Sequence, residues 1–141
     1  MRILNGLFGW FQPRRQRCPN VLVDFSVKEA GIYLTIYNLS PHPACQLCIQ
    51  FDQPLKYFNG CKDLSIHPII QEISYLAPFK SIELFLDPID IFFYHLKVDH
   101  LCIDWRYEDE RGHCFQRQNI HDLKIYRNLP VHSRIEFSLN G

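Results

Sequence analysis

The sequence predicts an all-β protein whose strands run antiparallel. Apolar side chains recur at every second residue in segment after segment between Val21 and Tyr126, and prolines and glycines separate these segments. A period of two is typical of a strand with one buried face, because successive side chains of a strand point to opposite faces. Aromatic residues make up 14% of the chain, which suits sheets, where large flat side chains gain from cross-strand neighbours.

The first two strands are expected at residues 21–28 and 32–39. Residues 29–31 end in a glycine and allow only a tight connection, so the two strands should form a hairpin. The residues expected to face the interior are Val21, Val23, Phe25, Val27, Ile32, Leu34 and Ile36.

A third strand is expected at residues 45–52, where Leu47, Ile49 and Phe51 alternate with polar neighbours. It follows residues 38–44, whose two prolines cannot donate to a sheet ladder and therefore make the chain bend.

The middle of the chain is less regular. Residues 53–68 are interpreted as a loop long enough to cross from one sheet to the other, with a short strand at residues 64–66. Residues 69–76 fit both a strand and a short helix. The prolines that bracket this segment and the strands around it favour a strand.

The later segments return to clear alternation. Residues 80–87 and 99–108 are expected to be strands, and residues 113–126 form a hairpin with the second of them through a turn at residues 108–112. Residues 89–96 are apolar without alternation, so they form a loop over the end of the fold or a short helical turn. The inward residues would be Ile82, Leu84, Leu86, Leu101, Ile103, Trp105 and Tyr107.

About seven strands of this length and spacing bury their apolar faces most simply as two packed antiparallel sheets. The predicted fold is therefore an immunoglobulin-like two-sheet sandwich. Residues 1–20 would form an aromatic and basic N-terminal arm and residues 21–127 the β-sandwich domain. Residues 128–141 would form a C-terminal tail, in which residues 135–139 could add an edge strand.

Several segments resemble a known kind of domain. They are Asn-Leu-Ser-Pro-His-Pro-Ala at residues 38–44, Phe-Asp at 51–52, Leu-Ala-Pro-Phe-Lys at 76–80, and Ile-Asp-Trp-Arg-Tyr-Glu-Asp at 103–109, followed by Gly112. Together they resemble the uncharacterised bacterial immunoglobulin-like sandwich domains, in which a leucine-proline turn precedes a tyrosine-rich last hairpin. The resemblance implies an accessory or binding role. Residues 41–43, Pro-His-Pro, depart from the glycine-rich turn that is commoner in such domains.

The cysteines indicate a reducing compartment. Antibody-type immunoglobulin domains pair a cysteine of the second strand with one of the sixth, but residues 32–39 contain none. In an extended strand Cys45 and Cys48 would lie on opposite faces with α-carbons about 10 Å apart, beyond disulfide reach unless a turn or bulge intervenes. We therefore expect a cytoplasmic protein that uses its cysteines as small apolar residues.

One spacing suggests a metal site. The residues concerned are His42, Cys45, Cys48, Cys61 and His67, and their thiolates and imidazoles are the ligands that tetrahedral zinc prefers. Structural zinc sites present paired cysteines from a turn, whereas Cys45 and Cys48 fall in a segment already explained as a strand. A small zinc-binding protein is therefore the alternative function, and the favoured function needs no cofactor.

The sequence favours neither catalysis nor nucleic-acid binding. His100, Cys102 and Asp104 would share the solvent face of a strand, and no glycine-built oxyanion loop accompanies them. The acidic residues 108–110 are interpreted as a solvated hairpin tip. Fifteen basic and fifteen acidic residues cancel, so no overall field attracts nucleic acid.

The N-terminal arm places aromatic residues next to positive charge. Phe8, Trp10 and Phe11 precede Arg14 and Arg15, a combination suited to a membrane surface or to an apolar groove on a partner. A frayed or docked arm is the alternative. The apolar stretch is too short to span a bilayer and lacks a small-residue cleavage site, which disfavours secretion.

Taken together, these features predict a non-enzymatic protein-binding or accessory module. We expect it to meet a protein partner through an edge strand or through its end loops. The N-terminal arm would tether it to that partner or, peripherally, to a membrane surface.

Overall fold

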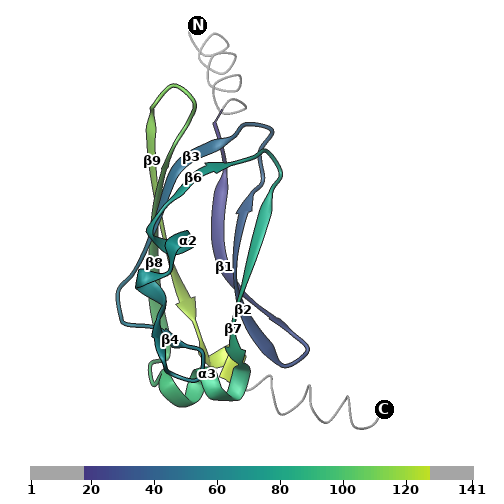
Figure 1. The fold of residues 1–141 in the computed structure, drawn as a ribbon, viewed down its shortest axis with the longest axis vertical. Coiled ribbons are helices and arrows are strands. Elements are labelled where there is room, and N and C mark those ends of the chain that lie inside the picture. Colours follow the sequence, from purple (N-terminus) through teal and green to yellow (C-terminus); the bar gives the residue numbers. More distant parts are fainter. Residues whose placement is uncertain (1–17, 128–141) are drawn as a thin grey trace, which may run out of the picture.

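The structure, a computed structural model, describes residues 18–127 and consists mostly of strands. The strands are β1 (Val21–Lys28), β2 (Gly31–Asn38), β3 (Ala44–Phe51), β4 (Lys56–Tyr57), β5 (Lys62–Asp63), β6 (Ile73–Leu76), β7 (Ser81–Pro88), β8 (His100–Glu108) and β9 (Cys114–Asp122). The helical segments are η1 (Leu64–Ile66), α2 (Pro68–Gln71) and α3 (Ile89–His95). Figure 1 shows two sheets that face each other, with α3 at one end and the tip of the β8–β9 hairpin at the other.

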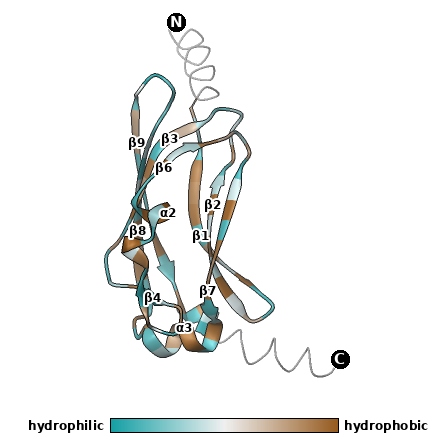
Figure 2. Ribbon diagram, in the orientation of Figure 1, coloured by the Kyte–Doolittle hydropathy of each residue, from teal (hydrophilic) through white to brown (hydrophobic). Residues whose placement is uncertain are grey.

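One sheet has the strand order β1-β2-β7 and the other has the order β6-β3-β8-β9, while β4 and β5 form a separate small hairpin. Every strand pairing is antiparallel. The prediction of an all-β chain with antiparallel strands is therefore confirmed. Phe25, Ile36, Ile49 and Trp105 lie in one buried cluster, and Figure 2 shows hydrophobic residues concentrated along β1 and in α3.

The β1–β2 hairpin forms as the sequence predicts. Lys28 pairs with Gly31, so that Glu29 and Ala30 make the turn. Both turn residues have positive φ, at 52° and 65°, which is the geometry of the two-residue turn whose twist matches that of its strands. In this register the expected inward residues of β1 and β2 are buried, except for Val27, which is half-buried.

Strand β3 contains a bulge that the sequence pattern does not announce. Cys45 pairs with Glu108 and Cys48 pairs with Arg106, so one extra residue lies between the two pairs. Gln46 takes up this extra residue with a φ of 53°. The extra residue changes which positions of β3 face the interior, from even-numbered residues before the bulge to odd-numbered residues after it. Ala44 is therefore buried together with the predicted Leu47 and Ile49.

The segment between β3 and β7 corrects two predictions. Residues 53–68 do not cross between sheets, because β6 pairs with β3 in the same sheet, and residues 64–66 form the helical turn η1 instead of a strand. The Asp63 side chain accepts a hydrogen bond from the backbone N–H of Ser65, 3.0 Å away. A side-chain cap of this kind supports a helical start against the β-propensity of the neighbouring residues.

Residues 69–76 combine the two alternatives that the sequence left open. Helix α2 begins at Pro68 and is followed by β6. Proline at the first helical position has the φ that a helix needs, and His67 Nδ1 accepts from the Ile69 N–H at 3.1 Å. The expected strand is therefore confirmed only for its last four residues.

The remaining elements follow their predictions. Residues 89–96 contain α3, the helical alternative, and Phe92 and Phe93 bury its inner face. The β8–β9 hairpin is present, although β9 ends at Asp122 and a short helical turn occupies residues 124–127. The C-terminal tail, including residues 135–139, and the arm up to residue 17 lie outside the described residues.

Candidate protein-binding surface

Each of the two main sheets has two edges, formed by β1 and β7 in one sheet and by β6 and β9 in the other. An edge strand presents a row of backbone N–H and C=O groups that its own sheet does not pair. Such groups must be covered by other parts of the protein, by water or by another chain. The four edges differ in how these backbone groups are covered.

Side chains of β8 and of the short helical turn after β9 cover the β1 edge. The backbone oxygen of Asn20 accepts from Leu39 N–H, which shows that even-numbered residues bond to β2 and odd-numbered residues face the edge. The Trp105 indole Nε1 donates to the Val21 carbonyl at 2.9 Å. The Tyr107 hydroxyl donates to the Pro19 carbonyl at 3.3 Å, and the Tyr126 hydroxyl donates to the Phe25 carbonyl at 3.4 Å.

Two side chains of β9 also reach the β1 edge. Arg117 donates to the Asn20 side chain and, at 3.4 Å, to the Val21 carbonyl. The His121 ring is 6% exposed, and its Nδ1 lies 3.3 Å from Asp24 Oδ1. Its ring packs edge-on against Phe25 with centroids 5.5 Å apart. These contacts hold β9 and β1 side by side.

Burial makes His121 an uncharged link. Loss of solvent lowers the pKa of His121, and the nearby Asp24 carboxylate only partly opposes this effect. Within the described part of the chain, His121 Nε2 is buried without a hydrogen-bond partner. A buried imidazole with one free nitrogen is stable when neutral, because a second proton would need an acceptor that this side of the ring lacks.

The β6 and β7 edges are short or interrupted. Strand β6 has four residues. On β7 the Leu86 carbonyl accepts from Phe58 N–H at 3.3 Å, and the Asp87 side chain accepts from Asn59 N–H at 2.9 Å. In the middle of its open stretch β7 carries Glu83, which pairs with Lys28 at 2.6 Å. A charge at this place discourages pairing with another strand.

The outward backbone groups of the β9 edge have neither the side-chain contacts of β1 nor the loop contacts of β7 within residues 18–127. Asp109 N–H donates to the His113 carbonyl, and Leu123 N–H donates to the Asp99 carbonyl. Odd-numbered residues of β9 therefore bond to β8, and even-numbered residues direct their backbone groups outward. No residue in the range 18–127 forms a hydrogen bond to these outward groups. The outward residues are Cys114, Gln116, Gln118, Ile120 and Asp122.

Strand β9 is also exposed on its two faces. It is nine residues long and contains neither proline nor lysine, and its exposed positions include Arg117 and Asn119 on the inner face. Ile120 on the outer face is 66% exposed. Only Phe115, which stacks on Tyr107 with centroids 5.5 Å apart, and the buried His121 anchor β9 to the core. An exposed edge of this length is a template for strand addition.

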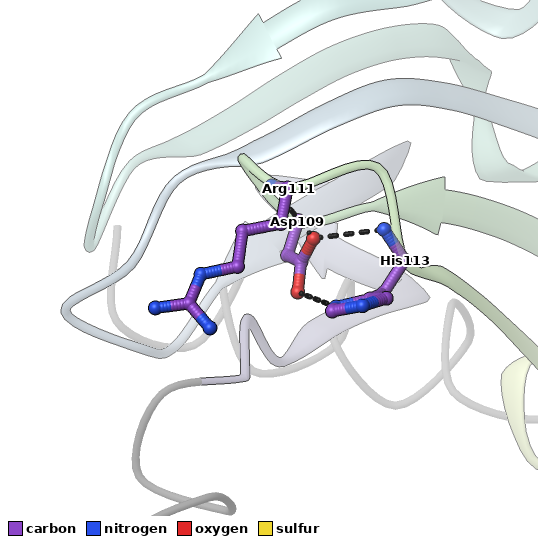
Figure 3. Close-up of polar contacts among 3 residues, drawn as sticks. All are labelled: Asp109, Arg111 and His113. Atoms are coloured by element: carbon purple, nitrogen blue, oxygen red, sulfur yellow. Dashed lines mark hydrogen bonds and ion pairs between the residues drawn. The ribbon is translucent and has the colours of Figure 1, made fainter.

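The hairpin tip next to β9 is held in one shape by Asp109 (Figure 3). Its Oδ1 accepts from the backbone N–H groups of Arg111 and His113, both at 2.9 Å, and its Oδ2 lies 3.0 Å from His113 Nδ1. Burial opposes ionisation of Asp109, but the hydrogen bonds from His113 and Arg111 outweigh it and lower the pKa of this carboxyl. The Arg111 side chain extends away from the carboxylate.

Two grooves flank this end of β9. One has a volume of about 730 Å³ and is lined by the hairpin tip and by the β2–β3 loop, including His42, Asp109 and His113. The other, of about 560 Å³, lies between the start of β1 and the inner face of β9, and Arg117 is part of its wall. Cys18 and Phe115 line both grooves. They give the open edge an approach of mixed polar and apolar character at its N-terminal end.

The structure does not gather the predicted zinc ligands. His42 lines a groove, Cys45 and Cys48 flank the bulge of β3, Cys61 lies in the turn between β4 and β5, and His67 caps α2. Burial and the nearby acids Glu110, Glu108 and Asp109 raise the pKa of Cys45, which disfavours the thiolate that zinc needs. In residues 18–127 no three His, Cys, Asp or Glu side chains are grouped to hold a metal ion.

The other predicted site residues belong to the arm. Phe8, Trp10, Phe11, Arg14 and Arg15 lie outside the described residues. The expectation of an edge-strand contact does not specify which of the four edges is used. The signal that identifies β9 is the stretch 114–122, which lacks the lysines and prolines that commonly protect an edge. None of the helices within residues 18–127 is long and apolar enough to cross a membrane.

These observations place the protein among small β-rich domains built from antiparallel sheets. More specifically, the chain belongs to the family described as a domain of unknown function (DUF8453), whose model matches residues 12–127. No curated protein matches the chain. Among solved structures, it is similar to the crystal structure of the "Putative ApaA Protein from Bordetella pertussis", with 12% sequence identity, coverage of 75% of this chain and 95% of that chain, and a TM-score of 0.39.

Proposed function

We propose that this chain is a non-enzymatic protein-binding module that adds an extended segment of a partner protein to β9. The observation that carries this proposal is the open edge of β9, whose even-numbered residues offer outward backbone groups along a nine-residue strand. Main-chain hydrogen bonds to such an edge supply affinity, and the neighbouring side chains supply specificity. The flanking grooves at the hairpin tip would hold side chains of the bound segment.

An immunoglobulin-like arrangement of the two sheets is part of the proposal. The chain runs β1-β2 in one sheet, β3 in the other, back to β7, and finally to β8-β9. This order differs from the four-plus-three arrangement of immunoglobulin constant domains in one respect, the pairing of the short strand β6 with β3 instead of β7. Sandwiches of this kind commonly serve as binding modules, which is a fold-level analogy.

A cytoplasmic location and the N-terminal tether remain proposals of the same kind. Among the described residues, Cys45, Cys48, Cys61, Cys102 and Cys114 are free, as expected in a reducing compartment. The balance of positive and negative charge supports a protein partner over nucleic acid. The tether would add the aromatic and basic residues of the arm to the contact with the partner or with a membrane surface.

The Gln118→Pro variant tests the binding edge. The N–H of Gln118 points away from β8, so proline removes an outward donor without removing a bond of the β8–β9 ladder. A photo-cross-linking phenylalanine at Ile120 should capture a protein in cells, and the additional Gln118→Pro change should abolish this capture. The matched control is Ser81→Pro, at the first residue of the β7 edge, which should leave the capture unchanged.

A second position of the cross-linker provides the result that would contradict the proposal. Tyr94 is 69% exposed and lies in α3, at the end of the sheets far from the hairpin tip (Figure 1). Equal capture of the same protein from Tyr94 and Ile120, or capture that survives Gln118→Pro, would show that β9 is not the binding edge.

A further inference from the structure

We propose that the segment added to β9 is the β9 strand of a second copy of this chain, with Gln118 of one copy opposite Gln118 of the other. This inference rests on the proposed function, since it requires that β9 accepts a strand. It names the partner as the chain itself. The result would be a symmetric dimer in which the two four-stranded sheets join into one continuous sheet.

The backbone pattern of β9 fits an antiparallel copy of itself. Outward backbone groups belong to even-numbered residues, so an added strand must place its own even-numbered residues opposite them. With Gln118 at the centre, Gln116 faces Ile120 of the second copy, and Cys114 faces Asp122. In this register every outward residue of β9 has a partner, whereas any shift leaves residues at the ends of the strand unpaired.

The side chains support the same register. The charged residues of β9 are Arg117 and Asp122. With Gln118 at the centre, Arg117 lies opposite Asn119 of the second copy, and no like charges face each other. A shift that centres the pair on residue 117 would place two Arg117 side chains directly opposite, which is destabilising. Charge therefore disfavours the register centred on residue 117, and the number of paired residues favours the register centred on Gln118 over every shift.

The state of the other edges explains why assembly would stop at two chains. Attachment of β9 to a different edge would be head-to-tail and would continue into a ring or a filament. The β1 edge is occupied by Trp105, Tyr107 and Tyr126. The β7 edge carries Glu83, and β6 has only four residues. A β9–β9 contact uses the longest open edge within residues 18–127 and closes on itself.

Sedimentation or light scattering of the full chain tests the dimer. We expect the unaltered protein to be a dimer that dissociates on dilution, Gln118→Pro to be a monomer, and Ser81→Pro to remain a dimer. A dimer that survives Gln118→Pro would overturn the inference, because the contact would then use another surface. A protein that is monomeric at every concentration would overturn it as well.

Cysteine cross-linking tests the register without depending on a proline variant. Directly opposed, hydrogen-bonded residues of antiparallel strands have α-carbons about 5.5 Å apart, within disulfide reach. Under a mild thiol oxidant such as diamide, Gln118→Cys should give a covalent dimer on a non-reducing gel. Gln116→Cys, which faces Ile120 of the second copy, should give no more dimer than the unaltered chain with its own cysteines. Equal yields from both variants would contradict the register.

The two proposals fail in distinguishable ways. If the chain is monomeric while the cross-linker at Ile120 captures another protein and Gln118→Pro abolishes that capture, the self-pairing is wrong and the proposed function stands. If the chain is monomeric and Ile120 captures nothing, strand addition to β9 is wrong altogether.

Discussion

Strands β1 and β9 lie side by side at the edges of the two sheets, yet one edge is closed and the other is open. The carbonyl groups along the β1 edge, from Pro19 to Phe25, receive hydrogen bonds from Trp105, Tyr107 and Tyr126, each of which follows its acceptor by more than eighty positions in the sequence. The outward groups of β9 receive none from the described residues. The fold thus protects an edge with polar tips of large aromatic side chains, without adding a strand.

An edge strand can be closed to stabilise the fold, or left open to associate with another chain. Aromatic residues with a polar tip can bury their rings and still satisfy a backbone group at the rim of the core. At β1 this stabilises the fold. At β9 no aromatic side chain of the described residues plays this part. The side chains of Gln116 and Gln118 instead lie on the exposed face and donate weak hydrogen bonds to Asp104. We therefore expect changes at β1 contacts to alter stability, and changes at β9 to alter association.

The largest effect is expected from Trp105→Phe. This change removes the indole donor to the buried Val21 carbonyl and leaves a space beside it, so the free energy of unfolding should fall by about 2 kcal/mol. Urea denaturation measures this loss. The control is Tyr94→Phe, in which an exposed hydroxyl is removed and little should change. A loss no larger than that of the control would mean that the indole contact does not hold the β1 edge.

Tyr107→Phe should have a smaller effect of the same kind. Its ring remains stacked on Phe115, while the hydroxyl contact with the Pro19 carbonyl is lost, at a cost of about 1 kcal/mol. The free energy of unfolding again gives the measurement. Hydrogen exchange at the Val21 amide, which lies 3.5 Å from the same hydroxyl, should become faster, and unchanged protection would contradict the proposed closing contact.

The comparison of the two edges also explains what the sequence could and could not predict. Alternation is local, so β1, β2, β7 and β8 were predicted correctly, and their expected inward residues are buried except for Val27, Ile82 and Leu84, which are half-buried. The bulge at Gln46 was missed because a positive φ at a glutamine has no strong sequence signal. The turn η1 was missed because the Asp63–Ser65 cap outweighs the apolar character of Leu64 and Ile66.

The candidate surface depends on contacts that no short sequence window contains. Trp105 and Val21 are 84 positions apart, so the contact that closes the β1 edge cannot be read from a short stretch of sequence. The contrast between the closed β1 edge and the open β9 edge therefore follows only from the three-dimensional structure. The zinc hypothesis rests on a local feature of the sequence. It used the spacing of Cys45, Cys48 and Cys61 along the chain, whereas the strand bulge and the β4–β5 turn carry them to separate places.

The change of stability with pH should arise in part from His121, whose side chain joins the β1 and β9 edges. Burial lowers its pKa in the folded protein below the ordinary value, which is about 6.5. As the pH falls below that value, the unfolded chain binds a proton that the folded protein does not, so the free energy of unfolding decreases. Above that value the stabilising difference is fully present.

Urea denaturation at a series of pH values checks this sign. His121→Asn should flatten the dependence between neutral and mildly acidic pH. The control His100→Asn concerns an exposed histidine of β8 and should leave the slope as it is. A stability that rises on acidification through this range, and loses that rise in His121→Asn, would mean that the pair with Asp24 dominates over burial and that His121 is charged in the fold.

The smallest effect on stability is expected at Gln118, the position at which a change to proline should have the greatest effect on association. Gln118→Thr introduces a polar β-branched side chain on the exposed outer face, where such residues favour strands, and gives up a weak 3.4 Å contact with Asp104, so the free energy of unfolding should change by no more than about 0.5 kcal/mol. Because a threonine retains its N–H, strand addition should also persist. Gln118→Pro differs from it in that one outward donor and in the restricted φ. If both variants lost association equally, the side chain of Gln118 and not the open backbone edge would be responsible, and β9 would differ from β1 in its surface chemistry alone.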